Sequence, residues 1–192
     1  MIVFAESHII KTTLNELTRQ GYKCQNFGTV IELYKFGRES IYWHGDKKCF
    51  FYNALGKPFK VIVAGSRNYI DYEFVKSKLD VILSNKRNIE IVSGACSTGI
   101  VTFIRLDGTK VYGADGLGEK YAAERGHLVR YFPANWDGLG RKAGHVRNKE
   151  MAIYAAPDGG CIVFRKNMSP GSTGMAGYAE QYGLKTKLYD VN

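Results

Sequence analysis

Three segments of this chain combine glycines, hydroxyl groups and guanidinium groups in a way that suits anion binding. They are residues 65–67 (Gly-Ser-Arg), residues 140–148 and residues 169–174. Glycine lets the backbone approach a ligand closely, and the guanidinium groups of Arg67 and Arg147 can each bind a carboxylate or phosphate through two parallel hydrogen bonds. The combination predicts a pocket for a nucleotide or a sugar phosphate.

Further candidate residues stand where a predicted strand ends or a predicted helix begins. Ser93 and Gly94 end a second apolar run, and Gly113 and Asp115 open a helical pattern. Trp136 either stacks on a base or packs its loop against the sheet, and both interpretations are open. The complete set of predicted ligand-binding residues is Gly65, Ser66, Arg67, Ser93, Gly94, Gly113, Asp115, Trp136, Arg147, Asn148, Pro170, Gly171, Ser172, Thr173 and Gly174.

The first strand that must position these residues spans residues 60–67. Its run Val61-Ile-Val-Ala64 is apolar throughout, which is typical of a strand covered on both faces. Asp71 is the predicted N-cap of a helix that follows at once. A strand, a glycine turn and a helix in this order are the common device for holding phosphate at a helix N-terminus. Ser66-Arg67 replaces the usual dinucleotide fingerprint, so we expect no NAD-type cofactor.

Four more strand-and-helix units follow. They predict a Rossmann-like α/β fold for residues 58–192, in which a parallel sheet carries helices on both faces and binds its ligand at the carboxyl ends of the strands. The predicted strands are residues 89–94, 127–132, 160–164 and 185–191, and the predicted helices are residues 114–125, about 147–155 and 173–182.

Residues 97–112 interrupt this alternation. Asp107-Gly108 between two alternating runs predicts a β-hairpin, inserted beside the expected site. It either contributes to ligand or partner binding or is a tolerated surface insertion. Because an isolated hairpin is only marginally stable, we expect Ile100, Phe103 and Val111 to be buried against a second copy in a homodimer.

Residues 1–57 predict a small α+β module. Apolar residues at helical spacing between Ile9 and Leu17 predict a helix that ends at Gly21. Three alternating segments predict an antiparallel meander, whose aromatic residues form either a core or a stacking platform for nucleic acid. The segments are residues 30–36, 40–44 and 48–52, with turns at Gly37-Arg38 and Gly45-Asp46, and the aromatic residues are Tyr34, Phe36, Tyr42, Trp43, Phe50 and Tyr52.

Composition excludes several classes of protein. The 192 residues are 45% hydrophobic, which is sufficient for a core, but no apolar run approaches the roughly 20 residues of a membrane span. We therefore expect a soluble, cytoplasmic protein. Its four cysteines lack CxxC or Cys/His spacing, so we expect neither a metal site nor another cofactor. The net charge of +9 favours phosphorylated or polyanionic partners, although it also serves solubility.

The glycine, serine and arginine segments of residues 65–174, taken in order along the chain, resemble the motifs of the SLOG superfamily, and more specifically of its YspA/YpsA-related branch. The resemblance covers about residues 59–191 and is most specific between Trp136 and Met151, where the pattern is W-x-x-x-G-x-x-A-G-x-x-R-N-x-x-M. It implies a Rossmann-like fold that binds nucleotides or nucleotide-derived ligands. Relatives of this kind include the cytokinin-activating phosphoribohydrolases and the DNA-uptake protein DprA.

The chain departs from the family pattern at two places. The hairpin splits the usually continuous SG-x-x-x-GAD loop, and no glutamate lies between Met175 and Tyr178, where the hydrolases carry one. Asp115 is then the one nearby carboxylate for acid–base chemistry. The alternative is that its negative charge only stabilises the helix N-terminus through the helix dipole. We therefore expect a nucleotide-binding sensor or sequestering protein. The alternatives are a nucleotide hydrolase of the phosphoribohydrolase type and a DprA-like nucleic-acid binder.

Overall fold

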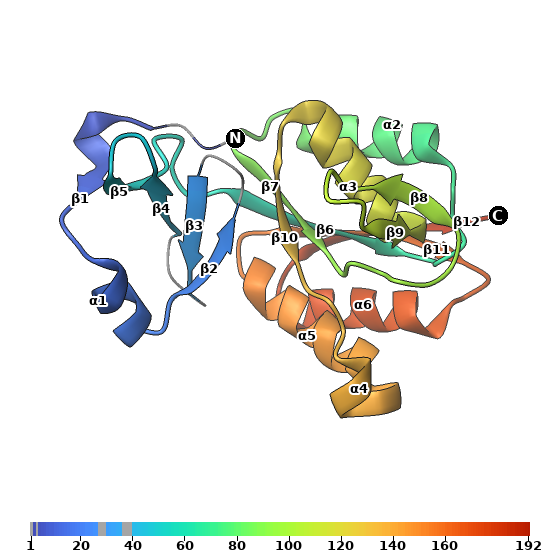
Figure 1. Ribbon diagram of the computed structural model, residues 1–192. Helices are drawn as coiled ribbons and strands as arrows, with labels where there is room; N and C mark the ends of the chain where they lie inside the picture. The colour runs from blue at the N-terminus through green and yellow to red at the C-terminus, as the bar shows by residue number, and fades with distance from the viewer. Residues whose placement is uncertain (1, 3, 27–29, 36–39) are drawn as a thin grey trace. The chain divides into compact units, whose positions relative to one another are not determined.

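The computed structural model of the chain describes residues 2, 4–26, 30–35 and 40–192. The chain divides into two compact units, Met1–Pro58 and Phe59–Asn192. The second unit holds a five-stranded parallel sheet with helices on both faces, and the first holds a separate five-stranded antiparallel sheet (Figure 1). The predicted α/β fold class is confirmed.

The parallel sheet is wound so that its first and fourth strands are neighbours. The strands are β6 (Phe59–Gly65), β7 (Ile89–Ser93), β10 (Leu128–Tyr131), β11 (Gly160–Lys166) and β12 (Lys185–Val191), and they lie in the order β10-β7-β6-β11-β12. The chain first builds the sheet outward from β6 to β10 and then returns to build it outward from β11. Ligands of such sheets bind where this direction reverses, at the carboxyl ends of the strands.

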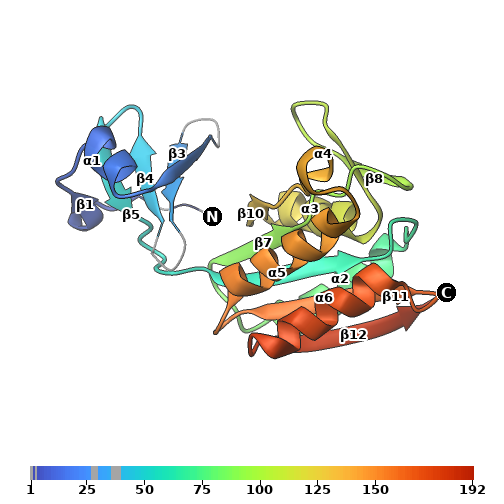
Figure 2. The same ribbon diagram turned by 90° about the horizontal axis from the view of Figure 1, so that it is seen from below.

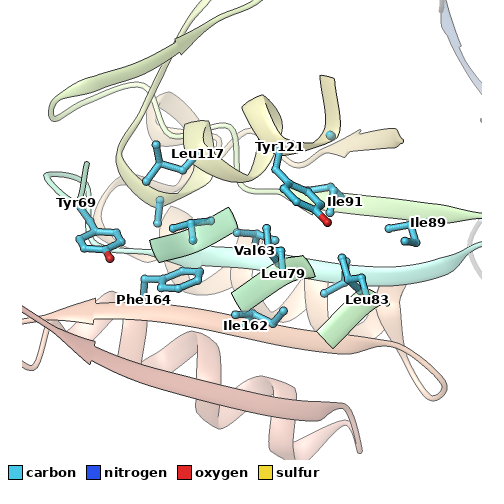
Figure 3. Packing of buried hydrophobic residues seen from close by; sticks show 14 residues of the cluster. Val63, Tyr69, Leu79, Leu83, Ile89, Ile91, Leu117, Tyr121, Ile162 and Phe164 are labelled. Carbon is cyan, nitrogen blue, oxygen red and sulfur yellow. The ribbon is translucent and has the colours of Figure 1, made fainter. Parts of the chain in front are cut away.

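Two helices cover each face of the sheet (Figures 1 and 2). On one face, α2 (Tyr72–Leu83) and α3 (Gly113–Arg125) bury Leu79 and Leu117 against Val63 and its neighbours (Figure 3). On the other, α5 (Ala143–Ala155) and α6 (Pro170–Gln181) bury a second cluster. Short turns of helix, α4 (Trp136–Leu139) and the 3₁₀ helix η2 (Gly140–Lys142), lead into α5.

The helix ends follow from local chemistry. The Asp71 carboxylate accepts a hydrogen bond from the Phe74 N–H at 3.0 Å, so the predicted N-cap of α2 is confirmed. Gly126 ends α3 with φ at 65°, a conformation that glycine adopts without strain. Pro170 occupies the first turn of α6, where its missing N–H costs no helical hydrogen bond.

Residues between β7 and α3 form an antiparallel hairpin of β8 (Val101–Ile104) and β9 (Lys110–Tyr112). Both strands contact α3 of the same chain. Val111, which we expected a second copy to cover, is already only 1% exposed in the single chain. That expectation is wrong for Val111, because α3 begins directly after β9 and offers the covering surface. The homodimer itself stays a prediction, which light scattering at micromolar concentration tests.

The first unit differs from its prediction in two places. Ile9 and Ile10 form a short strand, β1, that pairs with Phe51 and Phe50, and the helix α1 is confined to Leu14–Arg19. The other strands are β2 (Lys23–Asn26), β3 (Val30–Tyr34), β4 (Ile41–His44) and β5 (Cys49–Tyr52), in the order β1-β5-β4-β3-β2, and a 3₁₀ turn, η1 (Glu6–His8), precedes β1. The predicted meander is therefore present but carries a further strand at each edge. The turn at Gly37-Arg38 and Phe36 lie outside the described residues.

Four of the predicted aromatic residues of this first unit, Tyr42, Trp43, Phe50 and Tyr52, are buried or pack against its core. Tyr42 and Phe50 are buried, and the ring centroids of Trp43 and Phe50 are 4.8 Å apart. Trp43 and Tyr52 pack against the buried cluster that contains Phe50. These side chains therefore support the core interpretation rather than an exposed stacking platform. Within the part of the chain that the structure describes, no helix has the length and apolar character to span a membrane.

Candidate functional site

A cleft of about 640 Å³ lies at the carboxyl ends of β6 and β11, where the winding of the sheet reverses. Segments far apart in the sequence meet here. The lining residues are Ala64, Gly65, Ser66, Arg67, Asn68, Cys96, Ile100, Tyr112, Asp115, Trp136, Arg141, Gly144, His145, Arg147, Asn148, Lys166, Asn167, Ser169, Gly171, Ser172 and Met175. Nine of the fifteen predicted ligand-binding residues are among them: Gly65, Ser66, Arg67, Asp115, Trp136, Arg147, Asn148, Gly171 and Ser172.

The floor of the cleft is the turn that ends β6. A Cβ atom on Gly65 would lie 2.2 Å from the Phe164 carbonyl oxygen, so only glycine lets β6 and β11 approach this closely. The Ser66 N–H donates to that same carbonyl at 2.9 Å, and the Ser66 hydroxyl accepts a hydrogen bond from the Lys166 N–H at 2.8 Å. Ser66 therefore ties the ends of the two strands together, and this turn positions Arg67 at the cleft.

Three predicted site residues at the end of β7 and the start of α3 pack behind the surface of the cleft. A Cβ atom on Gly94 would collide with the Arg147 guanidinium, and Gly113, at a φ of 55°, lies against the Ser66 carbonyl. The Ser93 hydroxyl donates to the Glu119 carboxylate at 2.6 Å inside the core. Ser93, Gly94 and Gly113 thus shape the wall of the cleft without lining it.

Asp115 and Arg147 form the polar centre of the site. The Arg147 Nη1 lies 3.7 Å from the Asp115 Oδ2, and it also donates to the Gly94 carbonyl oxygen. The Cys96 N–H donates to the same Asp115 oxygen at 3.2 Å. Burial raises the pKa of Asp115 to about 6, although the neighbouring Arg147 lowers it. A carboxyl group with such a pKa changes its charge close to neutral pH.

Asn148 joins this centre to the first turn of α6. Its side chain accepts a hydrogen bond from the Arg147 Nε at 2.9 Å and donates to the Gly171 carbonyl at 3.2 Å. Arg147 is thereby held from two sides, with part of its guanidinium still at the cleft. The first N–H groups of a helix have no acceptor within that helix, so the first turn of α6 presents donors at this edge of the cleft.

Cations outnumber the carboxylate around the cleft. Arg67, Arg141, Arg147 and Lys166 line it, while Asp115 is the sole acidic residue among the described lining residues. The Arg67 guanidinium lies 5.8 Å from the centre of the Trp136 ring, and Trp136 is 44% exposed. The exposure favours a surface open to a ligand over a tryptophan packed against the sheet. This balance of charge attracts anions.

The structure does not bring every predicted residue to the cleft. Pro170, Thr173 and Gly174 lie in the first turns of α6 without lining it. The Thr173 hydroxyl accepts a hydrogen bond from the Arg165 side chain at 3.1 Å and donates to the Ser169 carbonyl at the same distance. Thr173 therefore connects the end of β11 to the start of α6, outside the cleft.

Several lining residues escaped prediction. Lys166 and Asn167 lie beyond residue 164, where the sequence pattern ended the strand, although β11 continues to Lys166. The seven residues of β12 pair one to one with Gly160–Lys166. The predicted length of the last strand therefore already indicated that its neighbour extends to residue 166. His145 lies inside the predicted segment 140–148 but was not in the set of ligand-binding residues, and it lines the cleft because α5 begins at Ala143, one turn earlier than expected. Ile100 and Tyr112 come from the base of the hairpin.

Comparison with protein-family models, with curated proteins and with solved structures found no match for this chain. The resemblance to the SLOG superfamily therefore rests on the motifs alone.

Proposed function

We propose that this protein binds a nucleotide or nucleotide-derived ligand in the cleft at the carboxyl ends of β6 and β11, as a sensor or sequestering protein. One observation carries the proposal. The glycine turn after β6, the first turn of α6 and four cationic side chains converge at the point where the winding of the sheet reverses. Parallel sheets of this architecture bind phosphorylated ligands at that position.

The anionic group of the ligand lies, in this proposal, between Arg67, Lys166 and the first turn of α6. Gly171 supports this placement, because a Cβ atom built on it meets nothing within 4 Å and the backbone is open to close approach. Arg147 adds a charged donor whose orientation is fixed by Asn148 and the Gly94 carbonyl. The exposed Trp136 ring offers a stacking surface for a base.

A thermal-shift screen of the purified protein tests the proposal. The screen would use nucleoside mono-, di- and triphosphates, ADP-ribose derivatives and cyclic nucleotides, because a ligand that binds only the folded state raises the melting temperature. We expect at least one nucleotide to do so, and the Arg67→Ala variant to lose the shift. If no nucleotide stabilises the protein at millimolar concentration, the proposal is wrong.

A second candidate function is hydrolysis of the nucleotide. It is favoured by Asp115, a buried carboxyl group at the cleft whose pKa of about 6 suits proton transfer. Against it, Met175 lines the cleft in the region where the hydrolases of the SLOG superfamily carry a glutamate. We expect no release of free base from nucleoside monophosphates. Steady release that Asp115→Asn abolishes would make the protein a hydrolase instead.

A further inference from the structure

The hairpin is bonded directly to the turn that forms the floor of the cleft. The Ile100 N–H donates to the Arg67 carbonyl at 3.1 Å, and the Gly113 N–H donates to the Ile100 carbonyl at 2.9 Å. The Ala114 N–H completes the set by donating to the Ser66 carbonyl at 3.2 Å. The base of the hairpin therefore has a fixed position relative to the Ser66-Arg67 turn.

A buried ion pair fixes the rest of the hairpin. Arg105, just after β8, binds the Glu119 carboxylate of α3 through two hydrogen bonds of 2.7 and 2.9 Å. Glu119 is 1% exposed, and its carboxylate also accepts the Ser93 hydroxyl. The Arg105 guanidinium lies 3.9 Å from the centre of the Tyr131 ring. The ion pair therefore anchors the hairpin to α3, the helix that carries Asp115.

Only one part of the hairpin faces the cleft. Ile100 and Tyr112, at its base, are lining residues, whereas Ile104 and Leu106, toward its tip, are not. The hairpin lies on the same side of the sheet as α2 and α3, and α4, α5 and α6 lie on the other side (Figure 1). The cleft thus has a wall from the hairpin that carries an isoleucine and a tyrosine. Its opposite wall carries Arg141 and Arg147.

We propose that this hairpin wall, together with the Trp136 ring across the cleft, recognises the nucleoside part of the ligand, while the floor and the arginines of the opposite wall bind its phosphates. The inference rests on the proposed function and deepens it. Ile100 and Tyr112 contact the base or the sugar, because the Ile100 side chain offers a phosphate no hydrogen bond and the Tyr112 ring offers a flat apolar face beside it. Arg105 touches no ligand and is a positioning residue that holds the wall in place.

The chain offers a matched pair of variants for the test. Ile100 and Ile104 are on the same hairpin and are 46% and 57% exposed, but only Ile100 lines the cleft. Isothermal calorimetry would measure the binding of inorganic pyrophosphate, ADP, GDP, CDP and UDP to the wild type, Ile100→Ala and Ile104→Ala. Point variants are preferable to deletion of the hairpin, which would leave Glu119 buried without Arg105.

We expect at least one nucleoside diphosphate to bind the wild type more tightly than pyrophosphate. Ile100→Ala should weaken binding of that nucleotide about tenfold, since it removes three carbon atoms that the bound nucleoside would cover. Pyrophosphate should bind all three proteins equally, and Ile104→Ala should bind both probes like the wild type. Arg105→Lys keeps a charge beside Glu119 but loses the bidentate geometry, and should reduce the preference for the nucleotide without changing the affinity for pyrophosphate.

The outcomes separate this inference from the function on which it rests. If neither pyrophosphate nor any nucleotide binds the wild type, the proposed function is wrong and the inference falls with it. If nucleotides bind but no tighter than pyrophosphate, or if Ile100→Ala and Ile104→Ala behave alike, the hairpin is not the recognition wall. In that second case the anion site stands.

Discussion

Two arginine–carboxylate pairs of the second unit differ in their setting, since one is buried in the core and the other lies at the cleft. In the core, Arg130 of β10 lies 3.4 Å from the Glu90 carboxylate of β7, and the Tyr154 hydroxyl of α5 hydrogen-bonds to both side chains. At the cleft, Arg147 of α5 lies 3.7 Å from the Asp115 carboxylate of α3. The first pair is almost fully buried, whereas the Arg147 side chain keeps 18% of its exposure.

The comparison separates an ion pair that is closed inside the core from one that opens to the candidate site. Glu90, Arg130 and Tyr154 are buried and none of them lines the cleft, so we expect their network to stabilise or specify the fold. The Asp115–Arg147 pair is looser, opens to a cleft of about 640 Å³ and includes a carboxyl group with a raised pKa. Groups of this kind cluster at functional sites.

The largest expected effect comes from breaking the closed network. Arg130→Ala should cost about 3 to 5 kcal/mol of unfolding free energy, because it leaves Glu90 buried without its guanidinium partner. Urea unfolding followed by circular dichroism measures this loss. A loss below about 1 kcal/mol would show that the two pairs are not as different as their burial implies.

Arg147→Ala should instead act mainly on the ligand. We expect it to weaken binding of a nucleotide or of pyrophosphate by about 1.5 to 3 kcal/mol, the usual value of a hydrogen bond to a charged group. Its cost in unfolding free energy should be well below that of Arg130→Ala. A structural role for Arg147 predicts a different result, because Arg147 also donates a hydrogen bond to the Gly94 carbonyl. A fall in ligand-free melting temperature equal to that of Arg130→Ala would make Arg147 a structural residue.

Asp115 makes the open pair sensitive to pH. Its pKa is raised from 3.8 to about 6, so the ionised form is disfavoured in the folded state, and the contribution of Asp115 to stability improves as the pH falls through 6 toward 4. Protonation also removes a negative charge from an anion-binding cleft. Pyrophosphate should therefore bind Asp115→Asn about tenfold more tightly than the wild type at pH 7.5. The two proteins should converge at pH 5, and comparing them at each pH cancels the titration of the probe itself.

The sequence predicts the second unit better than the first for a physical reason. A strand such as Val61-Ile-Val-Ala64 is buried on both faces and followed by its own helix, so the local pattern is sufficient. Ile9 and Ile10 have helical spacing, yet they form a strand because β5 offers a pairing partner about forty residues away. β2, with the polar sequence Lys-Cys-Gln-Asn, has no strand signal of its own and is held by β3.

The candidate site was predictable where one residue type is required. Gly65 is required because β11 approaches β6 closely at this point. Arginine is favoured wherever an anion is to be bound, since its guanidinium group is a charged hydrogen-bond donor. Lys166 and Tyr112 were missed, since they line the cleft only because neighbouring elements bring them there. Pro170 marked the true start of α6, which was placed three residues too late. Contacts of this kind depend on register and helix placement, which local spacing does not encode.

The smallest expected effect completes the series with an exposed pair. Arg125 at the end of α3 lies 2.7 Å from the Asp80 carboxylate of α2, with 39% and 40% of the two side chains exposed. Water and salt screen such a pair, so Arg125→Ala should change the free energy of unfolding by less than about 1 kcal/mol. The difference from wild type should shrink further in 1 M sodium chloride, whereas the cost of Arg130→Ala should be nearly independent of salt. Arg125→Ala should also leave pyrophosphate binding unchanged, because Arg125 does not line the cleft. An unfolding cost that matches that of Arg130→Ala would mean that burial does not rank these pairs.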